Sequence, residues 1–209
     1  MPPSVKDLPP MLLDEGKHRP FSSPDFLYEI KFDGYRVLAE FGAGHVELRT
    51  RGGASCGSWF PEVVAELSKY TGGPYIVDGE VSVLDEIGRS DFNRLHARAQ
   101  RRRWYPGADA VTYCIFDLLL SRGVAIMDLP LFKRKARLIK LFTPPPANSL
   151  MVVSSIPAQG EELFSLAVQL KLEGLVAKHK DSLYLPGQRS TDWIKLKRKG
   201  AVPAQRFKR

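Results

Sequence analysis

Ionisable side chains lie inside segments whose other residues are typical of buried β-strands, and this feature constrains the fold most. The set comprises Lys31, Asp33, Asp78, Glu80, Asp117, Glu173, Lys178, Lys195 and Lys197. A charge in a buried strand costs several kcal/mol unless it is paired or bound to a ligand. A strand end or a partly exposed face explains each residue taken alone. Five such segments in a chain of 209 residues together predict one shared cleft lined by lysines and carboxylates.

Hydrophobic periodicity predicts short strands and helices in an irregular order. Strands are expected over residues 26–31, 35–41, 45–50, 75–84, 111–120, 174–178 and 193–197. Helices are expected from Pro61, after the N-cap candidate Asp91, over 130–142 and over 160–171. Because Asp33-Gly34 is typical of a tight turn, the first three strands are expected to form an antiparallel meander. Without regular βαβ alternation, this order predicts an α+β fold with largely antiparallel sheets.

Positive charge is concentrated at the C-terminal end of the chain. Residues 193–209 hold seven basic residues and no acidic one, in a chain whose net charge is +8. A basic end suits a polyanion partner, either nucleotide or nucleic acid, and equally a solvated tail. The only cysteines, Cys56 and Cys114, lie far apart and exclude a disulfide scaffold and a cysteine zinc site. With no secretory signal or membrane-spanning run, this composition favours the cytoplasm.

A cleft with both lysines and carboxylates suits a nucleoside triphosphate and a divalent cation. Lysines neutralise phosphate oxygens, and carboxylates bind Mg²⁺ through oxygen. The sequence has no G-x-x-x-x-G-K-[S/T] loop and no G-x-G-x-x-G loop, so side chains must hold the phosphates. A lysine crowded by other cations has a lowered pKa and is nucleophilic near neutral pH. This chemistry predicts that one of the lysines attacks the nucleotide itself.

Six short motifs resemble, in order, those of the covalent nucleotidyltransferases, a family of ATP-dependent DNA ligases, RNA ligases and mRNA capping enzymes. They are KFDGYR at 31–36, TRGG at 50–53, DGE at 78–80, YCIFDLL at 113–119, EGLVAK at 173–178 and WIKLK at 193–197. Each motif alone is common, whereas six in the family order form a strong signal. Glu29, two residues before Lys31, makes the pattern most similar to the ligase module of bacterial end-joining repair enzymes.

The resemblance implies two largely antiparallel sheets with flanking helices around a nucleotide cleft. It implies one adenylation domain over residues 1–209, with an extended lead-in over 1–24 and a basic tail over 198–209. It further implies that Lys31 attacks the α-phosphorus of ATP and that Asp33 sets the geometry around this lysine. The nucleotide-binding residues that it implies are Glu29, Ile30, Arg36, Arg51, Glu80, Phe116, Lys178, Lys195 and Lys197.

Within that nucleotide site, the resemblance implies particular roles. Glu29 and the backbone of Ile30 read adenine, and Phe116 stacks on the base. Glu80 and Glu173 bind the divalent metal, Mg²⁺ or Mn²⁺. AMP then passes to a 5′-phosphate, and a 3′-hydroxyl displaces AMP to seal a nick in double-stranded DNA. The resemblance thus implies a monomer of the bacterial cytoplasm that acts in DNA repair.

Three alternatives of organisation and function stay open at this point. Only 12 residues follow Lys197, so no OB-fold domain is expected in this chain. A separate OB-fold domain or an end-joining repair protein is then the expected partner, unless the chain is a minimal enzyme. An RNA ligase or a capping-type transferase shares the same motifs. A nucleotide- or DNA-binding module that has lost turnover is the third reading.

Overall fold

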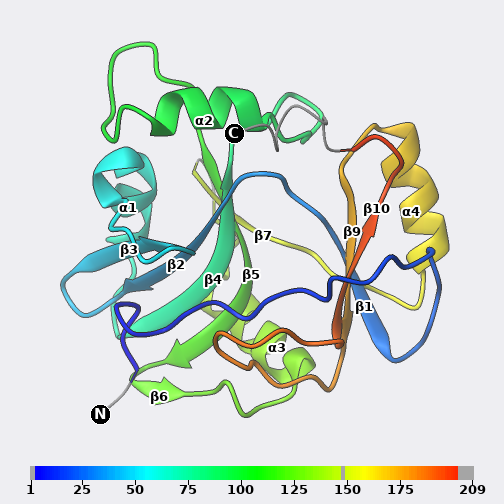
Figure 1. The fold of residues 1–209 in the computed structure, drawn as a ribbon. Helices are drawn as coiled ribbons and strands as arrows, with labels where there is room; N and C mark the ends of the chain where they lie inside the picture. Colours follow the sequence, from blue (N-terminus) through cyan, green and yellow to red (C-terminus); the bar gives the residue numbers. More distant parts are fainter. Residues whose placement is uncertain (1–2, 147–148, 202–209) are drawn as a thin grey trace.

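The protein, described here by a computed structural model over residues 3–146 and 149–201, contains two β-sheets with flanking helices (Figure 1). The larger sheet has the strand order β3-β2-β4-β5-β6, and β7 pairs with β5. Its strands are β2 (Tyr35–Phe41), β3 (Val46–Thr50), β4 (Tyr75–Ser82), β5 (Thr112–Ser121), β6 (Val124–Ala125) and β7 (Leu150–Val152). The β5–β7 pairing is parallel, and the other pairings are antiparallel.

The smaller sheet has the order β10-β9-β1-β8, and all its pairings are antiparallel. Its strands are β1 (Phe26–Ile30), β8 (Ile156–Pro157), β9 (Gly174–His179) and β10 (Trp193–Lys197). The predicted α+β class with largely antiparallel sheets is therefore confirmed. The predicted meander is wrong, because β1 and β2 belong to different sheets. Residues 31–34 carry the chain from one sheet to the other instead of closing a hairpin.

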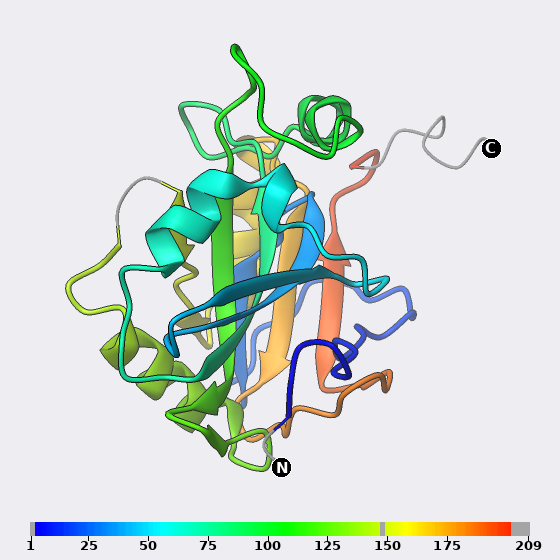
Figure 2. The ribbon, with the colours of Figure 1, turned by 90° about the vertical axis from the view of Figure 1, so that its left-hand side faces the viewer.

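Three of the helices in the described part of the chain pack on the sheets, and the second helix lies across one end of the molecule (Figure 1). In chain order the helices are α1 (Pro61–Leu67), α2 (Phe92–Ala99), α3 (Leu131–Leu141) and α4 (Gly160–Gln169), with a 3-10 turn over Gly57–Trp59. α3 packs on β5, and α4 packs on β9 and β1 (Figure 2). The Asp91 carboxylate accepts a bond from the Arg94 N–H and caps α2 as predicted. No helix in the described part of the chain is long and apolar enough to cross a membrane.

Three clusters of buried apolar side chains hold this arrangement. One lies between the larger sheet and its helices, and a second lies between the smaller sheet and α4. The third joins the two sheets, and it includes Leu38 of β2, Leu119 of β5 and Trp193 of β10. Val5 and Met11 of the lead-in are buried in this third cluster, so the extended N-terminal segment is part of the core. The junction of the sheets thereby fixes the walls of the site.

Candidate active site

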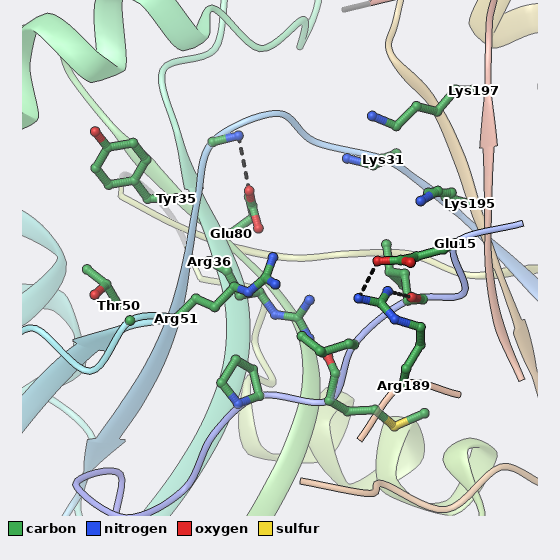
Figure 3. Close-up of a pocket in the computed structure, with 16 residues that line it drawn as sticks. Glu15, Lys31, Tyr35, Arg36, Thr50, Arg51, Glu80, Arg189, Lys195 and Lys197 are labelled. Atoms are coloured by element: carbon green, nitrogen blue, oxygen red, sulfur yellow. Dashed lines mark hydrogen bonds and ion pairs between the residues drawn. The ribbon is translucent and has the colours of Figure 1, made fainter. Parts of the chain in front are cut away.

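A cleft of about 510 Å³ opens between the two sheets (Figure 3). Its lysines, Lys31, Lys195 and Lys197, lie on the side of the smaller sheet, facing Arg36, Arg51 and Glu80 on the side of the larger sheet. A smaller cavity of about 50 Å³ adjoins it and is lined by Phe116, Lys178 and Trp193. Lys31, Arg36 and Glu80 line both spaces. The site therefore combines a basic part with an aromatic part, and Lys31 lies where the two meet.

Lys31 directly follows strand β1, which fixes its position in the cleft. Its backbone N–H donates to the Gly174 carbonyl at 2.9 Å, and its ammonium donates to Glu173 Oε2 at 2.7 Å. Gly174 has a φ of 148°, and a Cβ there would collide with the Leu196 carbonyl. Only glycine allows β9 to approach β10 so closely here. The glycine after Glu173 therefore places Glu173 beside Lys31.

The two-residue period of a strand places Arg36, Asp78 and Glu80 on one face of the larger sheet. Asp78 and Glu80 are two residues apart in β4, and Arg36 of β2 pairs in register with Glu80. Residues i and i+2 of a strand share a face. The opposite face of β4 buries Val77 and Val81 in the apolar core. The D-G-E spacing therefore directs both carboxylates toward the cleft and the valines away from it.

Arg36 forms a fork-shaped ion pair with Asp78. The two nitrogen–oxygen distances are 2.5 Å and 2.6 Å, and the Tyr184 hydroxyl also donates to Asp78 Oδ2 at 2.6 Å. Bidentate arginine–carboxylate pairs are among the stronger polar contacts in proteins. Asp78 is fully buried, so its charge needs these partners. Asp78 thus orients Arg36, and the guanidinium is what lines the cleft.

The Phe116 ring lies at an irregularity in β5. Asp117 pairs with Asp78 and Ile115 pairs with Gly79, so Phe116 has no partner in β4. Such bulges redirect a side chain beside functional sites. The Arg36 guanidinium carbon and the Lys178 nitrogen lie 4.6 Å and 4.2 Å from the ring centre. The ring is therefore engaged by two cations, and a stacked base competes with them for it.

Around Lys31, four charged side chains form what we call the open cluster: Lys31, Glu80, Glu173 and Lys197. Glu173 accepts from Lys31 at 2.7 Å and from Lys197 at 2.7 Å. Lys197 and Lys195 alternate in β10 with Ile194 and Leu196, which face α4. The Lys197 side chain is 36% exposed, and the Lys31 side chain is 17% exposed. Solvent and ligands therefore reach this cluster from the cleft.

Next to it lies a closed cluster of four residues: Glu29, Lys135, Ser155 and Lys178. Glu29 Oε1 accepts from Lys135 and from Ser155, each at 2.7 Å, and Oε2 accepts from Lys178 at 2.7 Å. Glu29, Lys135 and Lys178 are all buried. Burial alone would raise the pKa of Glu29, but the two ammonium groups outweigh it and leave this pKa lowered. Burial lowers the pKa of Lys178, which Glu29 offsets only in part.

The Glu80 carboxylate lies in a less favourable environment than Glu29. Burial raises its pKa to about 7, although Lys31, Arg36 and the N–H of Gly34 act in the opposite direction. The Gly34 N–H donates to Glu80 Oε1 at 3.1 Å. A Cβ at position 34 would collide with the Val81 carbonyl, so glycine is required for this approach. Glu80 is consequently poised to change its protonation state near neutral pH.

Carboxylates in the cleft fit a divalent cation that is shared with a substrate. The described residues contain no group of three or more His, Cys, Asp or Glu side chains able to hold a metal ion. Glu80 and Glu173 are near enough for the charge of Glu173 to raise the pKa of Glu80. Mg²⁺ commonly binds through one or two carboxylates together with substrate phosphates. Glu80 and Glu173 would therefore hold such an ion only together with phosphate oxygens.

Most of the predicted site residues come together, and three do not lie as the sequence suggested. Asp117 is not in the cleft, because it is fully buried in an ion pair with Arg134 at 2.8 Å. Asp78 does not line the cleft itself but orients Arg36, which does. Asp33 lines another cavity, with Ser90, Asp91 and Arg94, and its N–H donates to Ser90 Oγ at 3.1 Å. The remaining predicted residues line the two spaces or, for Glu173, contact Lys31 and Lys197.

The sequence did not indicate Lys135, Arg189 or the part of the lead-in that lines the cleft as site residues. Lys135 lies in the helix predicted over 130–142, but its side chain is buried, with 5% exposed. The helical period was the available signal, because Leu131, Lys135 and Leu138 recur on one face. Arg189 pairs with Glu15 at 2.6 Å across the cleft wall (Figure 3). No local pattern marks this pair, which joins segments far apart in the chain.

A family model described as "ATP dependent DNA ligase domain" matches residues 10–197. The multifunctional non-homologous end joining protein LigD of Mycolicibacterium smegmatis is 31% identical over 190 residues, covering 91% of this chain and 24% of that protein. The SPbeta prophage-derived DNA ligase-like protein LigB of Bacillus subtilis is 33% identical, covering 90% of this chain and 66% of that protein. This chain thus spans about a quarter of the first relative's length.

Solved structures agree with these sequence matches. The crystal structure of the ligase domain from M. tuberculosis LigD has a TM-score of 0.77 and 29% identity, covering 93% of this chain and 62% of that one. A mycobacterial DNA ligase D complexed with ATP and MES has a TM-score of 0.78 and 30% identity, with 93% and 61% covered. The arrangement of two sheets around a cleft is therefore that of these ligase domains.

Proposed function

The chain belongs to the ATP-dependent DNA ligase domain family, and from that membership we propose that it is an adenylation domain that transfers AMP from ATP to DNA through Lys31. The observation that carries the proposal is the position of Lys31 between the basic cleft and the aromatic cavity. A triphosphate suits the basic part, and a base suits the aromatic part. The α-phosphorus, which joins the two halves of ATP, would then lie beside the Lys31 nitrogen.

In the first step, the neutral Lys31 amine attacks the α-phosphorus of ATP. A nitrogen–phosphorus bond forms, the bond to the pyrophosphate oxygen breaks, and pyrophosphate leaves. Glu173 Oε2 lies 2.7 Å from the Lys31 nitrogen and is placed to accept its proton. Lys195, Lys197 and Arg51 neutralise phosphate charge along the cleft. A divalent cation between Glu80, Glu173 and the phosphates would further stabilise charge on the α-phosphate.

The next two steps move AMP onto DNA and release it. A 5′-phosphate oxygen attacks the phosphorus of the lysyl-AMP, and the nitrogen–phosphorus bond breaks, which returns the Lys31 amine. A 3′-hydroxyl then attacks the 5′-phosphorus, a phosphodiester forms and AMP leaves. Positioning and charge neutralisation are the main contributions of a protein to such displacements. The substrate that we propose is a nicked double-stranded DNA.

At the base end of the site, we propose that Glu29, the Ile30 backbone and Phe116 hold adenine. Glu29 accepts three hydrogen bonds, which leaves about one of its four lone-pair sites for an amino group. Ile30, Phe116 and Lys178 line the same small cavity as Glu29. The catalytic contribution of Asp33 stays a prediction, because its side chain lines a different cavity.

Mass spectrometry of the intact chain tests this proposal directly. After incubation with ATP and Mg²⁺ or Mn²⁺, the wild type is expected to gain the mass of one AMP, and Lys31→Ala is expected to gain none. Lys31→Arg is the matched control, since it keeps the charge but is a poor nucleophile, and it must also stay unlabelled. An adduct on Lys31→Ala, or no adduct on the wild type with pyrophosphatase present, would contradict the proposal.

Sealing assays then separate the remaining alternatives. We propose DNA rather than RNA nicks and ATP rather than GTP, in a monomer of the bacterial cytoplasm. Sealing of RNA, or labelling by GTP, would favour the RNA ligase or capping-type reading. A chain that labels Lys31 but seals only after an OB-fold domain or an end-joining protein is added would identify the expected partner. Residues 202–209, which include most of the predicted basic tail, lie outside the described residues.

A further inference from the structure

Three arginines and a tryptophan project from the molecule directly after helix α2. We call residues 101–104 the RRRW segment. All four side chains are exposed, and the Trp104 ring is 54% exposed. Figure 2 shows this part of the chain, in green, at the same end of the molecule as α2. Cationic and aromatic side chains side by side are typical of surfaces that bind nucleic acid.

The RRRW segment is anchored to the body of the protein. The Ser58 hydroxyl donates to the Arg102 carbonyl at 3.0 Å. The Arg102 guanidinium lies 5.9 Å from the Trp59 ring, and that of Arg101 lies 3.9 Å from the Tyr105 ring. Such cation–π contacts fix the arginine stems while leaving the N–H groups available. These contacts hold Arg101 and Arg102 in place before any ligand arrives, which lowers the entropic cost of binding.

Only two aromatic rings separate this segment from the cleft. Trp59, which contacts Arg102, also contacts the Tyr35 ring edge-on at 6.4 Å. Tyr35 in turn lies at the edge of the cleft with its ring pointing away from Lys31 and Arg36 (Figure 3), and its hydroxyl bonds with His96 of α2 at 2.6 Å. Contacts from Tyr35 to Trp59 and from Trp59 to Arg102 therefore connect the edge of the cleft to the RRRW segment.

The positive charge of the RRRW segment has no carboxylate partner among the described residues. Arg94 pairs with Asp109 at 2.5 Å, and Arg98 pairs with Glu62 at 2.6 Å, so the nearby carboxylates already have partners. No ion pair involves Arg101, Arg102 or Arg103 within residues 3–146 and 149–201. A ligand that extends beyond the cleft and carries charge at regular intervals would satisfy all three. Duplex DNA carries one negative charge for about every 1.7 Å of its axis.

We propose that the RRRW segment binds the DNA that flanks the nick, with its arginines on backbone phosphates and Trp104 against a sugar or base. This inference rests on the proposed function, because it takes DNA as the substrate in the cleft. It adds a second contact region outside the six motifs. The phosphate contacts carry no sequence preference and position the duplex relative to Lys31.

The test compares the salt dependence of DNA binding by four versions of this chain. They are the wild type, R101A/R102A/R103A, W104A and, as the control, K133A/R137A/K140A. The control removes the same number of exposed charges from α3. Binding of a nicked duplex is followed by fluorescence anisotropy over a range of salt concentrations. Each lost phosphate contact reduces the slope of log K against log [salt] by about 0.9.

R101A/R102A/R103A is expected to reduce that slope by about 2–3, while the α3 control keeps the slope of the wild type. W104A is expected to weaken binding about tenfold with an unchanged slope, because it removes an aromatic contact with the DNA but no phosphate contact. Equal slopes for the two triple variants would overturn the proposal, as would a wild type that does not bind the duplex.

AMP labelling of Lys31, measured on the same four proteins, keeps this inference distinct from the proposed function. All four are expected to label equally, since none of the changed residues lines the cleft. If the wild type stays unlabelled but R101A/R102A/R103A still reduces the salt slope of DNA binding, the proposed function fails and the DNA surface stands. If labelling is normal but the two triple variants bind DNA alike, the proposed function stands and the DNA surface is overturned.

Discussion

The closed and open clusters have nearly the same chemistry and very different surroundings. In each, one glutamate accepts hydrogen bonds from two lysines at 2.7 Å. Both glutamates are nearly buried, but their lysines differ. Lys135 and Lys178 beside Glu29 are buried, whereas Lys31 and Lys197 beside Glu173 line the cleft and are 17% and 36% exposed. A buried charge cluster has little freedom to change partners, because each unpaired charge would be costly. An open cluster can exchange partners for phosphate or metal. The difference gives Glu29 the larger part in stability, beside its proposed contact with adenine, and gives Glu173 the part in proton transfer.

The largest expected effect comes from a mutation that breaks the open cluster. Glu173→Gln removes the group that accepts the Lys31 proton, so the rate of lysyl-AMP formation is expected to fall 10²–10⁴-fold. Rapid-quench measurement of AMP transfer gives this rate. The free energy of unfolding is expected to fall by only about 1–2 kcal/mol, because Lys31 and Lys197 keep contact with solvent in the cleft although Glu173 itself is nearly buried. A labelling rate equal to that of the wild type would show that Glu173 is an ion-pair partner of Lys31 and does not accept its proton.

Breaking the closed cluster is expected to give the opposite result. Glu29→Gln leaves the Lys135 and Lys178 ammonium groups buried without a carboxylate. Loss of one partner from a buried ion pair costs about 3–5 kcal/mol, so the free energy of unfolding should fall by that amount. Guanidinium chloride titration measures it, and Glu173→Gln is the matched control. If both variants unfold alike, the two clusters do not differ in the way that their burial indicates.

The contrast between the clusters also shows what the sequence can predict. Ionisable residues within strand-like segments were sufficient to predict that Glu80, Lys178 and Lys195 line one cleft, because the composition of a strand is a local property. The resemblance added the order of the motifs. Neither could separate Glu29 from Glu173, since burial depends on Lys135, which lies more than 100 residues from Glu29. The exposure of a charge is decided by packing between distant segments.

The same limit explains the wrong hairpin. Asp33-Gly34 has the composition of a tight turn, and turn residues are a local signal. Strand β1 nevertheless pairs with β9, about 150 residues later, and β2 pairs with β4. Pairing with distant strands outweighed the local preference, and the turn became a crossover between sheets. That crossover places Lys31 and Gly34 at the mouth of the cleft, where Gly34 contacts Glu80.

The smallest effect concerns pH and separates Glu80 from Glu29. The folded-state pKa of Glu80 is raised to about 7, above the ordinary value of 4.5. Between these values the folded state binds more protons than the unfolded state, so the stability due to protonated Glu80 is lost as pH rises through 7. The lowered pKa of Glu29 acts in the opposite direction, since its contribution is lost as pH falls below the ordinary value.

Glu80→Gln isolates the Glu80 contribution. Relative to this variant, the wild type is expected to lose about 1–3 kcal/mol of unfolding free energy between pH 5 and pH 8, the lower figure allowing for access of solvent from the cleft. Denaturant titrations at several pH values measure the difference. Saturating the cleft with Mg²⁺ and a non-hydrolysable ATP analogue should abolish it, because a bound cation favours the carboxylate. If wild type and variant have parallel profiles, Glu80 is ionised throughout. Its place in the open cluster would then rest on geometry, with no part in proton exchange.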